Sequence, residues 1–344
     1  MTTNRINFSS REEWLAKRAE LNAEGIFGGS QVGAITGVSP WKSPYAIWAE
    51  CTGVVPMKAD ADLSPAQVER MRQGRDMEDY IAHRYCEKTG KAVHRVNAIL
   101  TSDTHPYLFA TIDRKVENEE AGLECKKMGD FAAMKMHGEI PAQYYAQCVA
   151  YMAATGMPTW HLAIMTNDEF RIWILTRDAE AAHEKPEWAE AVIVVDDGEF
   201  AALDEAAAAM HHYVLAKEQP PVDGADSTTE TIAAQFPAGN GADIDLAPFS
   251  DKFAEREALK AEIDARKERI AEIENEVKAY MGEADCGHAD GGWQITWKNQ
   301  VRQTTDVKSV AAWFGSQNQA VPDGLLKTTS LRVLRVTRRK PKGH

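Results

Sequence analysis

Residues 107–127, with the sequence YLFATIDRKVENEEAGLECKK, contain the pattern that decides the fold. Two strand-like runs, Tyr107–Val116 and Leu123–Lys126, flank the polar turn Glu117–Gly122, and this arrangement predicts a β-hairpin. Helix signals lie on both sides of the hairpin in the sequence. We therefore expect an α/β (α+β) fold in which helices flank a central mixed sheet.

The predicted hairpin brings two carboxylates and one ammonium group together. Strand side chains alternate, so Glu124 and Lys126 share one face of the sheet, and Asp113 on the first run can lie beside Glu124. Two adjacent carboxylates repel each other unless a cation joins them, and all-oxygen ligation suits Mg²⁺ or Mn²⁺. A neighbouring lysine can orient or help to deprotonate a metal-bound water, which predicts metal-assisted phosphodiester hydrolysis. The alternative is a cross-strand salt bridge on an exposed sheet face.

Two helices add polar residues to largely apolar faces. Glu78 shares a face with apolar residues at intervals of three and four, namely Met71, Gly74, Ile81 and Tyr85. A carboxylate there is costly to bury unless it is paired or bound to a metal, and the alternative is that this part of the face is less buried. Gln147 lies one turn from both Tyr144 and Tyr151. That spacing predicts a second polar patch near the site or, alternatively, an ordinary amphipathic helix.

The remaining segments outline a domain order. We expect a domain over residues 1–220, a linker over 221–251 and a long helix with a small basic α+β module over 252–344. The other elements predicted from capping and periodicity are a helix from Ser64 to Gly90, strands at Ala92–Val96, His161–Thr166, Phe170–Thr176 and Ala191–Val195, helices at Pro141–Thr155 and Glu199–Lys217, and in the last module strands at Trp293–Lys298 and Leu331–Thr337 with a helix at Val307–Phe314.

The long helix, predicted over Lys252–Met281, carries a roughly heptad apolar stripe. Arg256 and Arg266 interrupt that stripe, so a coiled coil there would be short or imperfect. The stretch Asp285–His344 has ten Lys or Arg and four Asp or Glu, together with Trp293, Trp297 and Trp313. Basic and aromatic residues together can hold DNA, and the alternative is a solubilising basic tail.

Composition limits the possible classes of function. The chain has 344 residues and a formal net charge of −13, which argues against a polycationic nucleic-acid coat but leaves room for a local basic site. It contains no apolar run long enough for a membrane helix and no secretory signal. Its five cysteines include no Cys-x-x-Cys pair, so we expect free thiols in a reducing cytoplasm.

Several short motifs occur in a specific order along the chain. They are Trp14–Arg18, Gly28–Gly37 with Pro40–Pro44, Gly74 with Glu78, His105-Pro106 through Asp113, Leu123–Lys126 and Pro141–Gln147. In this order the chain resembles the YqaJ-type viral recombinases, relatives of the exonuclease of bacteriophage lambda in the PD-(D/E)xK nuclease superfamily, over residues 10–175. It departs from the family at Gln31, where many relatives have Asp, and at Arg114, where glycine is common.

The resemblance implies a PD-(D/E)xK restriction-endonuclease-like core and a Mg²⁺-dependent exonuclease that digests double-stranded DNA from 5′ ends and leaves 3′ single strands; Mn²⁺ is a possible substitute. By resemblance, Asp113, Glu124 and the backbone carbonyl of Cys125 would hold the metal, with Glu78 beside them. Lys126 would position the attacking water. The resemblance assigns the substrate side of the site to Arg18 at the 5′-phosphate, to Ser30, and to Tyr144 and Gln147 as lining residues.

The expected partners are double-stranded DNA ends, a single-strand annealing protein and further copies of the same chain, with no membrane. Two other functions stay open. One is an endonuclease or nickase on the same core, and the other is a DNA-end-binding recombination protein with weak or no catalysis.

Overall fold

The structure is a computed structural model that describes residues 3–56, 64–129, 139–299, 301, 307–317 and 319–322. The chain divides into two compact units, Met1–Phe236 and Pro237–His344. The finer division into residues 1–220, 221–251 and 252–344 stays a prediction.

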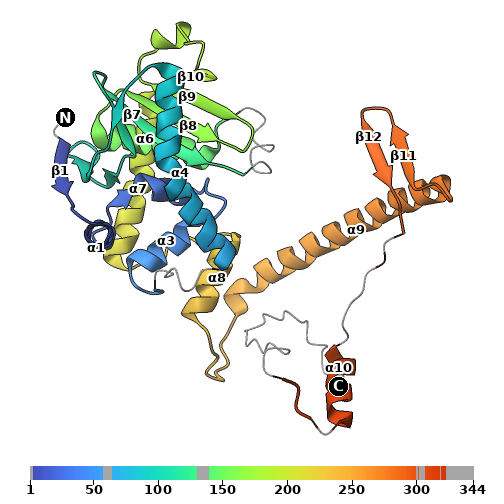
Figure 1. The fold of residues 1–344 in the computed structure, drawn as a ribbon. Helices are drawn as coiled ribbons and strands as arrows, with labels where there is room; N and C mark the ends of the chain where they lie inside the picture. The colour runs from blue at the N-terminus through green and yellow to red at the C-terminus, as the bar shows by residue number, and fades with distance from the viewer. Residues whose placement is uncertain are drawn as a thin grey trace. The chain divides into compact units, whose positions relative to one another are not determined.

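The first unit is built on two sheets (Figure 1). The larger sheet has the strand order β10-β9-β8-β7-β6-β3 and the smaller one β1-β4-β5-β2. The strands are β1 (Thr3–Asn7), β2 (Phe27–Gly28), β3 (Val93–His94), β4 (Ala98–Ser102), β5 (Leu108–Ala110), β6 (Arg114–Val116), β7 (Ala121–Lys127), β8 (Thr159–Met165), β9 (Phe170–Thr176) and β10 (Ala191–Val194). The larger sheet is mixed, because β7 pairs with β8 in parallel whereas β6 pairs with β7 antiparallel.

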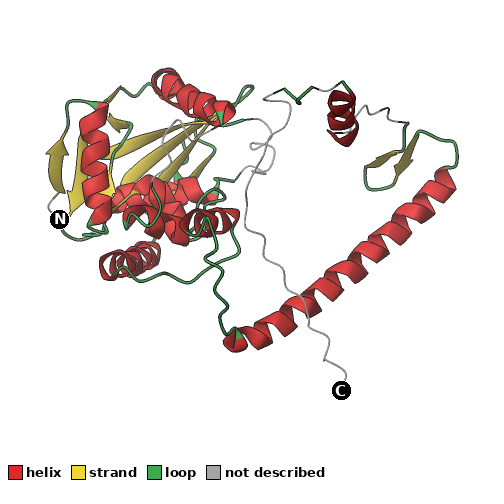
Figure 2. Cartoon of the chain, turned by 90° about the horizontal axis from the view of Figure 1, so that it is seen from below, coloured by secondary structure: helices red, strands yellow, loops and turns green. Residues whose placement is uncertain are grey.

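Helices cover both faces of the larger sheet, as Figure 2 shows from below. Those of the first unit are α1 (Arg11–Ala23), α2 (Gly29–Ile35), α3 (Pro44–Cys51), α4 (Pro65–Thr89), α6 (Ala142–Thr155), α7 (Asp197–Ala216) and α8 (Asp226–Gln235), with a short 3₁₀ turn at Ala181–His183. Tyr85 of α4 packs with Leu123 and Cys125 of β7, while α6 packs with Trp160 of β8 on the opposite face. The expected α/β fold with a central mixed sheet between helices is confirmed.

Helix α4 begins and ends where its sequence predicts. Ser64 caps it, since its side chain accepts from the backbone N–H of Gln67, and the Gln67 side chain accepts in return from the backbone N–H of Ser64. Gly90 ends the helix at a φ of 72°, a left-handed conformation that favours glycine. One face of the second half of α4 is buried through Ile81, Ala82 and Tyr85, and its first turns are exposed.

The predicted strand Tyr107–Val116 is wrong as one element. It is divided between β5 in the smaller sheet and β6 in the larger sheet, with residues 111–113 crossing between them. The physical reason lies at the crossing, where the carboxylate of Asp113 accepts the backbone N–H of Cys125 at 2.9 Å. A side chain thus takes the place that a backbone carbonyl would have in a continued ladder. The strand predicted at Ala92–Val96 is also shorter, and only Val93–His94 pair.

Part of the predicted linker is helical. Helix α8 lies within it and contacts α3, where Thr228 donates to the Ser43 hydroxyl at 2.7 Å and the Tyr45 hydroxyl donates to Gln235 at 2.8 Å. These side-chain contacts attach the segment to the first unit.

The second unit contains a 3₁₀ turn at Ala247–Phe249, the long helix α9 (Ser250–Met281), the hairpin of β11 (Cys286–Ala289) with β12 (Trp293–Thr296), and α10 (Val307–Ser316). The strand at the end of the predicted module, Leu331–Thr337, and its arginine-rich surroundings lie outside the described residues. In the part of the chain that the structure describes, no helix combines the length and the apolar character that a membrane span requires.

Gly122 of β7 tests the packing of the larger sheet. A Cβ at this position would lie 2.3 Å from the indole of Trp160, which is fully buried. We expect Gly122→Ala to lower the free energy of unfolding by about 2 kcal/mol or more, because the indole must move inside a close-packed core. Urea unfolding followed by tryptophan fluorescence measures this change.

Gly74→Ala is the matched control, because no atom lies within 4 Å of its added Cβ on α4. Alanine favours helix over glycine, so this variant should keep or raise stability by about 1 kcal/mol or less. Equal effects of the two substitutions would contradict the packing described for β7.

Candidate active site

The antiparallel pairing of β6 with β7 builds the centre of the site. Arg114 lies opposite Leu123, so Asp113, one residue before β6, meets Glu124 across the ladder. Leu123 and Cys125 face α4, while Glu124 and Lys126 face the α6 side, as alternation predicts. The structure thus brings together the two carboxylates and the lysine.

Glu124 is buried among polar partners. Its side chain is 3% exposed, and its Oε1 atom lies 2.5 Å from the Lys126 ammonium and accepts from Gln147 Nε2 at 2.8 Å. Gln147 also donates to the Tyr151 hydroxyl at 2.8 Å. The second oxygen, Oε2, is buried and has no hydrogen-bond partner among the described residues. A buried carboxylate oxygen without a partner is costly, which makes this atom a ready ligand for a cation.

The charges at this centre depend on one another. Burial raises the pKa of Asp113 well above its usual range, and the carboxylates of Glu124 and Glu78 raise it further. Burial by itself would lower the pKa of Lys126, but Glu124 and Asp113 more than offset this and raise that pKa above its ordinary value. Lys126 is therefore a firmly protonated cation next to crowded carboxylates.

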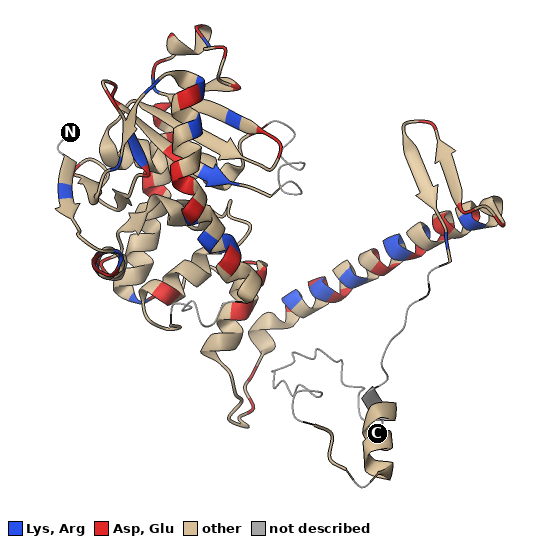
Figure 3. Cartoon of the chain, viewed as in Figure 1, with Lys and Arg blue, Asp and Glu red and all other residues tan. Residues whose placement is uncertain are grey.

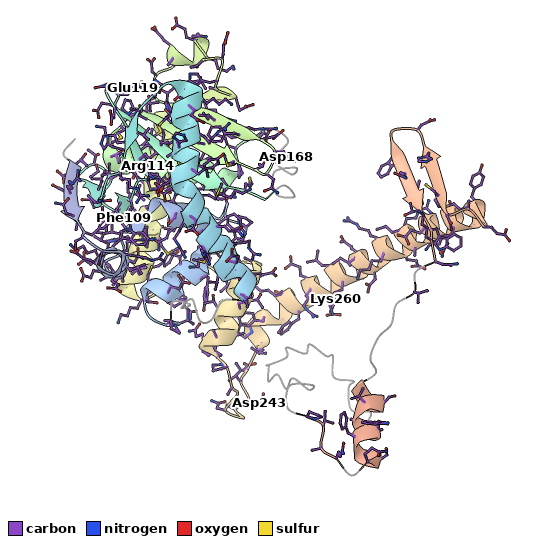
Figure 4. All side chains as sticks on the ribbon, viewed as in Figure 1. Phe109, Arg114, Glu119, Asp168, Asp243 and Lys260 are labelled. Carbon is purple, nitrogen blue, oxygen red and sulfur yellow. The ribbon has the colours of Figure 1, made fainter. Side chains whose placement is uncertain are left out.

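Glu78 is held by a cation of the chain itself. Arg114 is buried, and its Nη1 atom donates to Glu78 Oε1 and to the backbone carbonyl of Asp113, both at 2.5 Å. The same guanidinium pairs with Asp79, which also pairs with Arg95. Figure 4 labels Arg114 where β6 passes α4. Glu78 thus lines the cleft with its carboxylate against an arginine, and its place beside a metal stays a prediction.

The residues fit a divalent cation that also needs ligands from elsewhere. No group of three or more His, Cys, Asp or Glu side chains surrounds a single metal position within the described ranges. Asp113 and Glu124 supply two carboxylates, one of them with the unpartnered oxygen. Mg²⁺ commonly takes one or two protein carboxylates and completes its shell with waters and substrate phosphate oxygens. The two carboxylates therefore suit Mg²⁺, and the Cys125 carbonyl as a further ligand stays a prediction.

Arg18 of α1 lines a cleft that also contains Asp113, Glu124 and Lys126. Its guanidinium lies 4.6 Å from the ring centroid of Trp14 and 5.9 Å from that of Phe109, and Nη2 donates to the Ser30 hydroxyl at 3.4 Å. Burial lowers the pKa of Arg18. Two aromatic rings and the start of α2 therefore hold this arginine in place.

Tyr144 lies beside the lysine. The Lys126 ammonium is 5.3 Å from the Tyr144 ring centroid, and the indole of Trp41 is 6.4 Å from the same ring. Tyr144 thus lies beside Lys126, and its role as a residue that lines the site stays a prediction.

One cleft of about 570 Å³ contains most of these residues. Five arginines line it, together with the acidic residues described above: Arg11, Arg18, Arg75, Arg95 and Arg114. The sequence does not predict Arg11, Arg75 or Arg95 as site residues. Arg75 precedes Glu78 by three residues on one helix, a spacing that places both on one face, whereas nothing in the local sequence singles out Arg95. Figure 3 shows basic and acidic residues intermixed on the strands and helices of this unit.

The sequence of this chain is similar to a known domain family and to a protein of Bacillus subtilis. Residues 13–158 match the model of the YqaJ-like viral recombinase domain. The chain is also 28% identical over 312 residues to "Uncharacterized protein YqaJ" of Bacillus subtilis (strain 168), a match that spans 89% of this chain and 88% of that protein.

Solved structures give weaker matches. An alkaline exonuclease (LHK-Exo) from Laribacter hongkongensis is 18% identical with a TM-score of 0.43, and the match covers 60% of this chain and 94% of that one. A phage related exonuclease from Haemophilus somnus 129PT is 12% identical with a TM-score of 0.37, covering 57% and 96% of the two chains.

Arg114 provides a test of the site's internal ion pairs. We expect Arg114→Met to lower the free energy of unfolding by about 2 kcal/mol, because a buried guanidinium and its charged hydrogen bonds are lost. Urea unfolding measures the change, and Glu78→Gln in the same background should reduce the penalty.

The control is Arg84→Met on α4, since Arg84 makes an exposed pair with Glu87. Exposed pairs contribute little, so this variant should stay within about 0.5 kcal/mol of the parent. A loss at Arg114 no larger than the loss at Arg84 would show that the buried network does not stabilise the fold.

Proposed function

We propose, from the match of residues 13–158 to the model of the YqaJ-like viral recombinase domain, that this protein is a Mg²⁺-dependent 5′→3′ exonuclease that acts on double-stranded DNA ends and leaves 3′ single-stranded overhangs. The proposal rests on the buried Oε2 of Glu124 beside Asp113 and Lys126, an oxygen that has no hydrogen-bond partner among the described residues. Mn²⁺ is a possible substitute for Mg²⁺.

The chain's own groups divide the work of hydrolysis. Asp113 and Glu124 would hold the cation, which when bound activates a water and stabilises the charge on the scissile phosphate. Gln147 fixes the orientation of the Glu124 carboxylate through Oε1 and leaves Oε2 free for the cation. Lys126, held protonated by its carboxylate neighbours, would orient the attacking water and donate hydrogen bonds to the phosphate oxygens.

Arg18 supports the assignment of a 5′ end. A guanidinium binds a terminal phosphate through parallel N–H donors, and two aromatic rings already fix this one inside the cleft. The other cleft arginines would hold the duplex backbone. Such an enzyme would work in the cytoplasm of the bacterial host, pass its 3′ strand to a single-strand annealing protein and act as a homo-oligomer.

The activity test uses the purified full chain with Mg²⁺ and two DNAs, a linear duplex with 5′-phosphates and a covalently closed circle. We expect nucleotides to be released from the linear duplex, a resistant 3′ strand to remain and the circle to stay intact. Cutting of the circle would replace the exonuclease by an endonuclease or nickase. Tight binding of ends without cleavage under Mg²⁺ or Mn²⁺ would leave a DNA-end-binding protein.

Glu124→Gln and Lys126→Ala should each reduce the cleavage rate by at least about 100-fold, because they remove a metal ligand and the group that orients the water. Glu124→Gln should also weaken Mn²⁺ binding without DNA, measured from the free Mn²⁺ signal in electron paramagnetic resonance.

Matched controls lie close by. Lys127→Ala removes the side chain of the next residue of β7, whose ammonium contacts Asn167 away from the site. Glu120→Gln neutralises an exposed carboxylate. Both variants should keep the parent rate and the parent Mn²⁺ affinity. Full activity in Glu124→Gln or Lys126→Ala would refute the site.

Arg18→Ala should lower the rate about tenfold or more on 5′-phosphorylated ends and much less on 5′-hydroxyl ends, because the phosphate loses its charged partner. Lys17→Ala on the same helix, where Lys17 pairs with Glu13, is the control. Equal losses on both kinds of end would contradict a role for Arg18 at the 5′-phosphate.

A further inference from the structure

Helix α9 displays an apolar stripe that nothing covers in the described part of its unit. None of its residues is buried, and the exposed fractions of the stripe residues range from 37% to 95%. The stripe consists of Leu259, Ile263, Ile270, Ile273, Val277 and Tyr280. Singly exposed apolar residues are common, but a contiguous row along a helix of 32 residues marks an interaction surface.

The spacing of the stripe is that of a coiled coil. With Arg266 included, the intervals alternate strictly between four and three residues from Leu259 to Tyr280. In the usual heptad letters, Ile263, Ile270 and Val277 occupy successive a positions. All three are β-branched, and β-branched residues at a combined with leucine at d favour a pair of parallel helices. The d positions here hold Leu259, Arg266, Ile273 and Tyr280.

The charges flanking the stripe match those of a second copy of the same helix. In a parallel, in-register pair, each g residue faces the e residue five positions later on the partner helix. Three of the four such pairs along α9 join opposite charges: Glu255 with Lys260, Glu262 with Lys267, and Arg269 with Glu274. The fourth pairs Glu276 with Met281. Figure 3 shows acidic and basic residues alternating along this helix, and Figure 4 labels Lys260 on it.

In the single chain the same charges make only exposed contacts within α9. Lys260 pairs with Glu257, Lys267 with Asp264 and Arg269 with Glu272, all between exposed side chains. Exposed ion pairs of this kind contribute little to stability. Breaking them so that the same side chains can pair with a second helix therefore costs little free energy.

We infer that α9 pairs with α9 of a second copy of this chain as a parallel, two-stranded coiled coil in register. A parallel, in-register arrangement sets each layer of the stripe against the same layer of its partner and joins all three charge pairs. The interaction surface belongs to the second unit and does not depend on the nuclease function proposed for the first.

Arg266 limits the strength of the pair. It occupies a d position in the middle of the stripe, so two guanidinium groups meet in one layer, at a cost in stability. Replacing this residue by leucine should therefore strengthen association, a result opposite to that expected for most surface substitutions.

Cysteine crosslinking of the full chain tests the pairing and its direction. Ile263→Cys is made in a Cys286→Ser background, because Cys286 is exposed. A parallel pair places the two cysteines at 263 next to each other, so mild oxidation should give a covalent dimer at least about fivefold more than the matched control Ala261→Cys, which lies at the outward f position. Equal crosslinking at 261 and 263, or none at 263, would overturn the proposal.

Sedimentation velocity on the full chain gives a second readout. Ile270→Asp should weaken association about tenfold or more, because it places a charge in an apolar layer, whereas Asn275→Asp at an outward position should leave it unchanged. Arg266→Leu should shift the distribution toward the larger species. Indistinguishable sedimentation of Ile270→Asp and Asn275→Asp would show that another surface holds the copies together, and would overturn the role of α9.

Discussion

The site depends on one constraint, the placing of two carboxylates against each other in a buried position. Asp113 and Glu124 meet because β6 and β7 pair, and burial makes their mutual repulsion costly. The fold supplies Lys126 as one counter-charge, and in the described part of the chain one oxygen of Glu124 has no partner. This buried oxygen, which has no hydrogen-bond partner among the described residues, is the observation that supports the proposed cation site.

Arg114 divides the acidic residues around this centre into two groups. Its buried guanidinium joins Glu78 to the Asp113 backbone and also reaches Asp79, so the chain itself neutralises the carboxylates on the α4 side. The carboxylates that face each other across the ladder are then Asp113 and Glu124. The net charge of −13 is thus compatible with a cleft that five arginines line, because the balance of the whole chain does not describe one site.

Local patterns predicted those features that local physics controls. The capping box at Ser64 and Gln67 and the left-handed Gly90 placed the ends of α4, and strand alternation placed Glu124 and Lys126 on one face. The crossing at Asp113 escaped prediction, because residues 107–116 have the pattern of one continuous strand and the change of sheet depends on tertiary contacts. Arg95 escaped for a similar reason, since its contact with Asp79 joins distant segments and leaves no periodic signal.

The two units also differ in what limits their interactions. In the first unit, burial and close packing fix the polar groups, so the chemistry rests on a few atoms whose partners are already set. In α9 no residue is buried, and apolar and charged side chains remain on the surface at heptad spacing. Contacts within the helix cannot bury this stripe further, because residues three and four apart already touch along one face. Its burial needs a second helix of matching period, and the arrangement of charges around the stripe meets that need with another copy of α9.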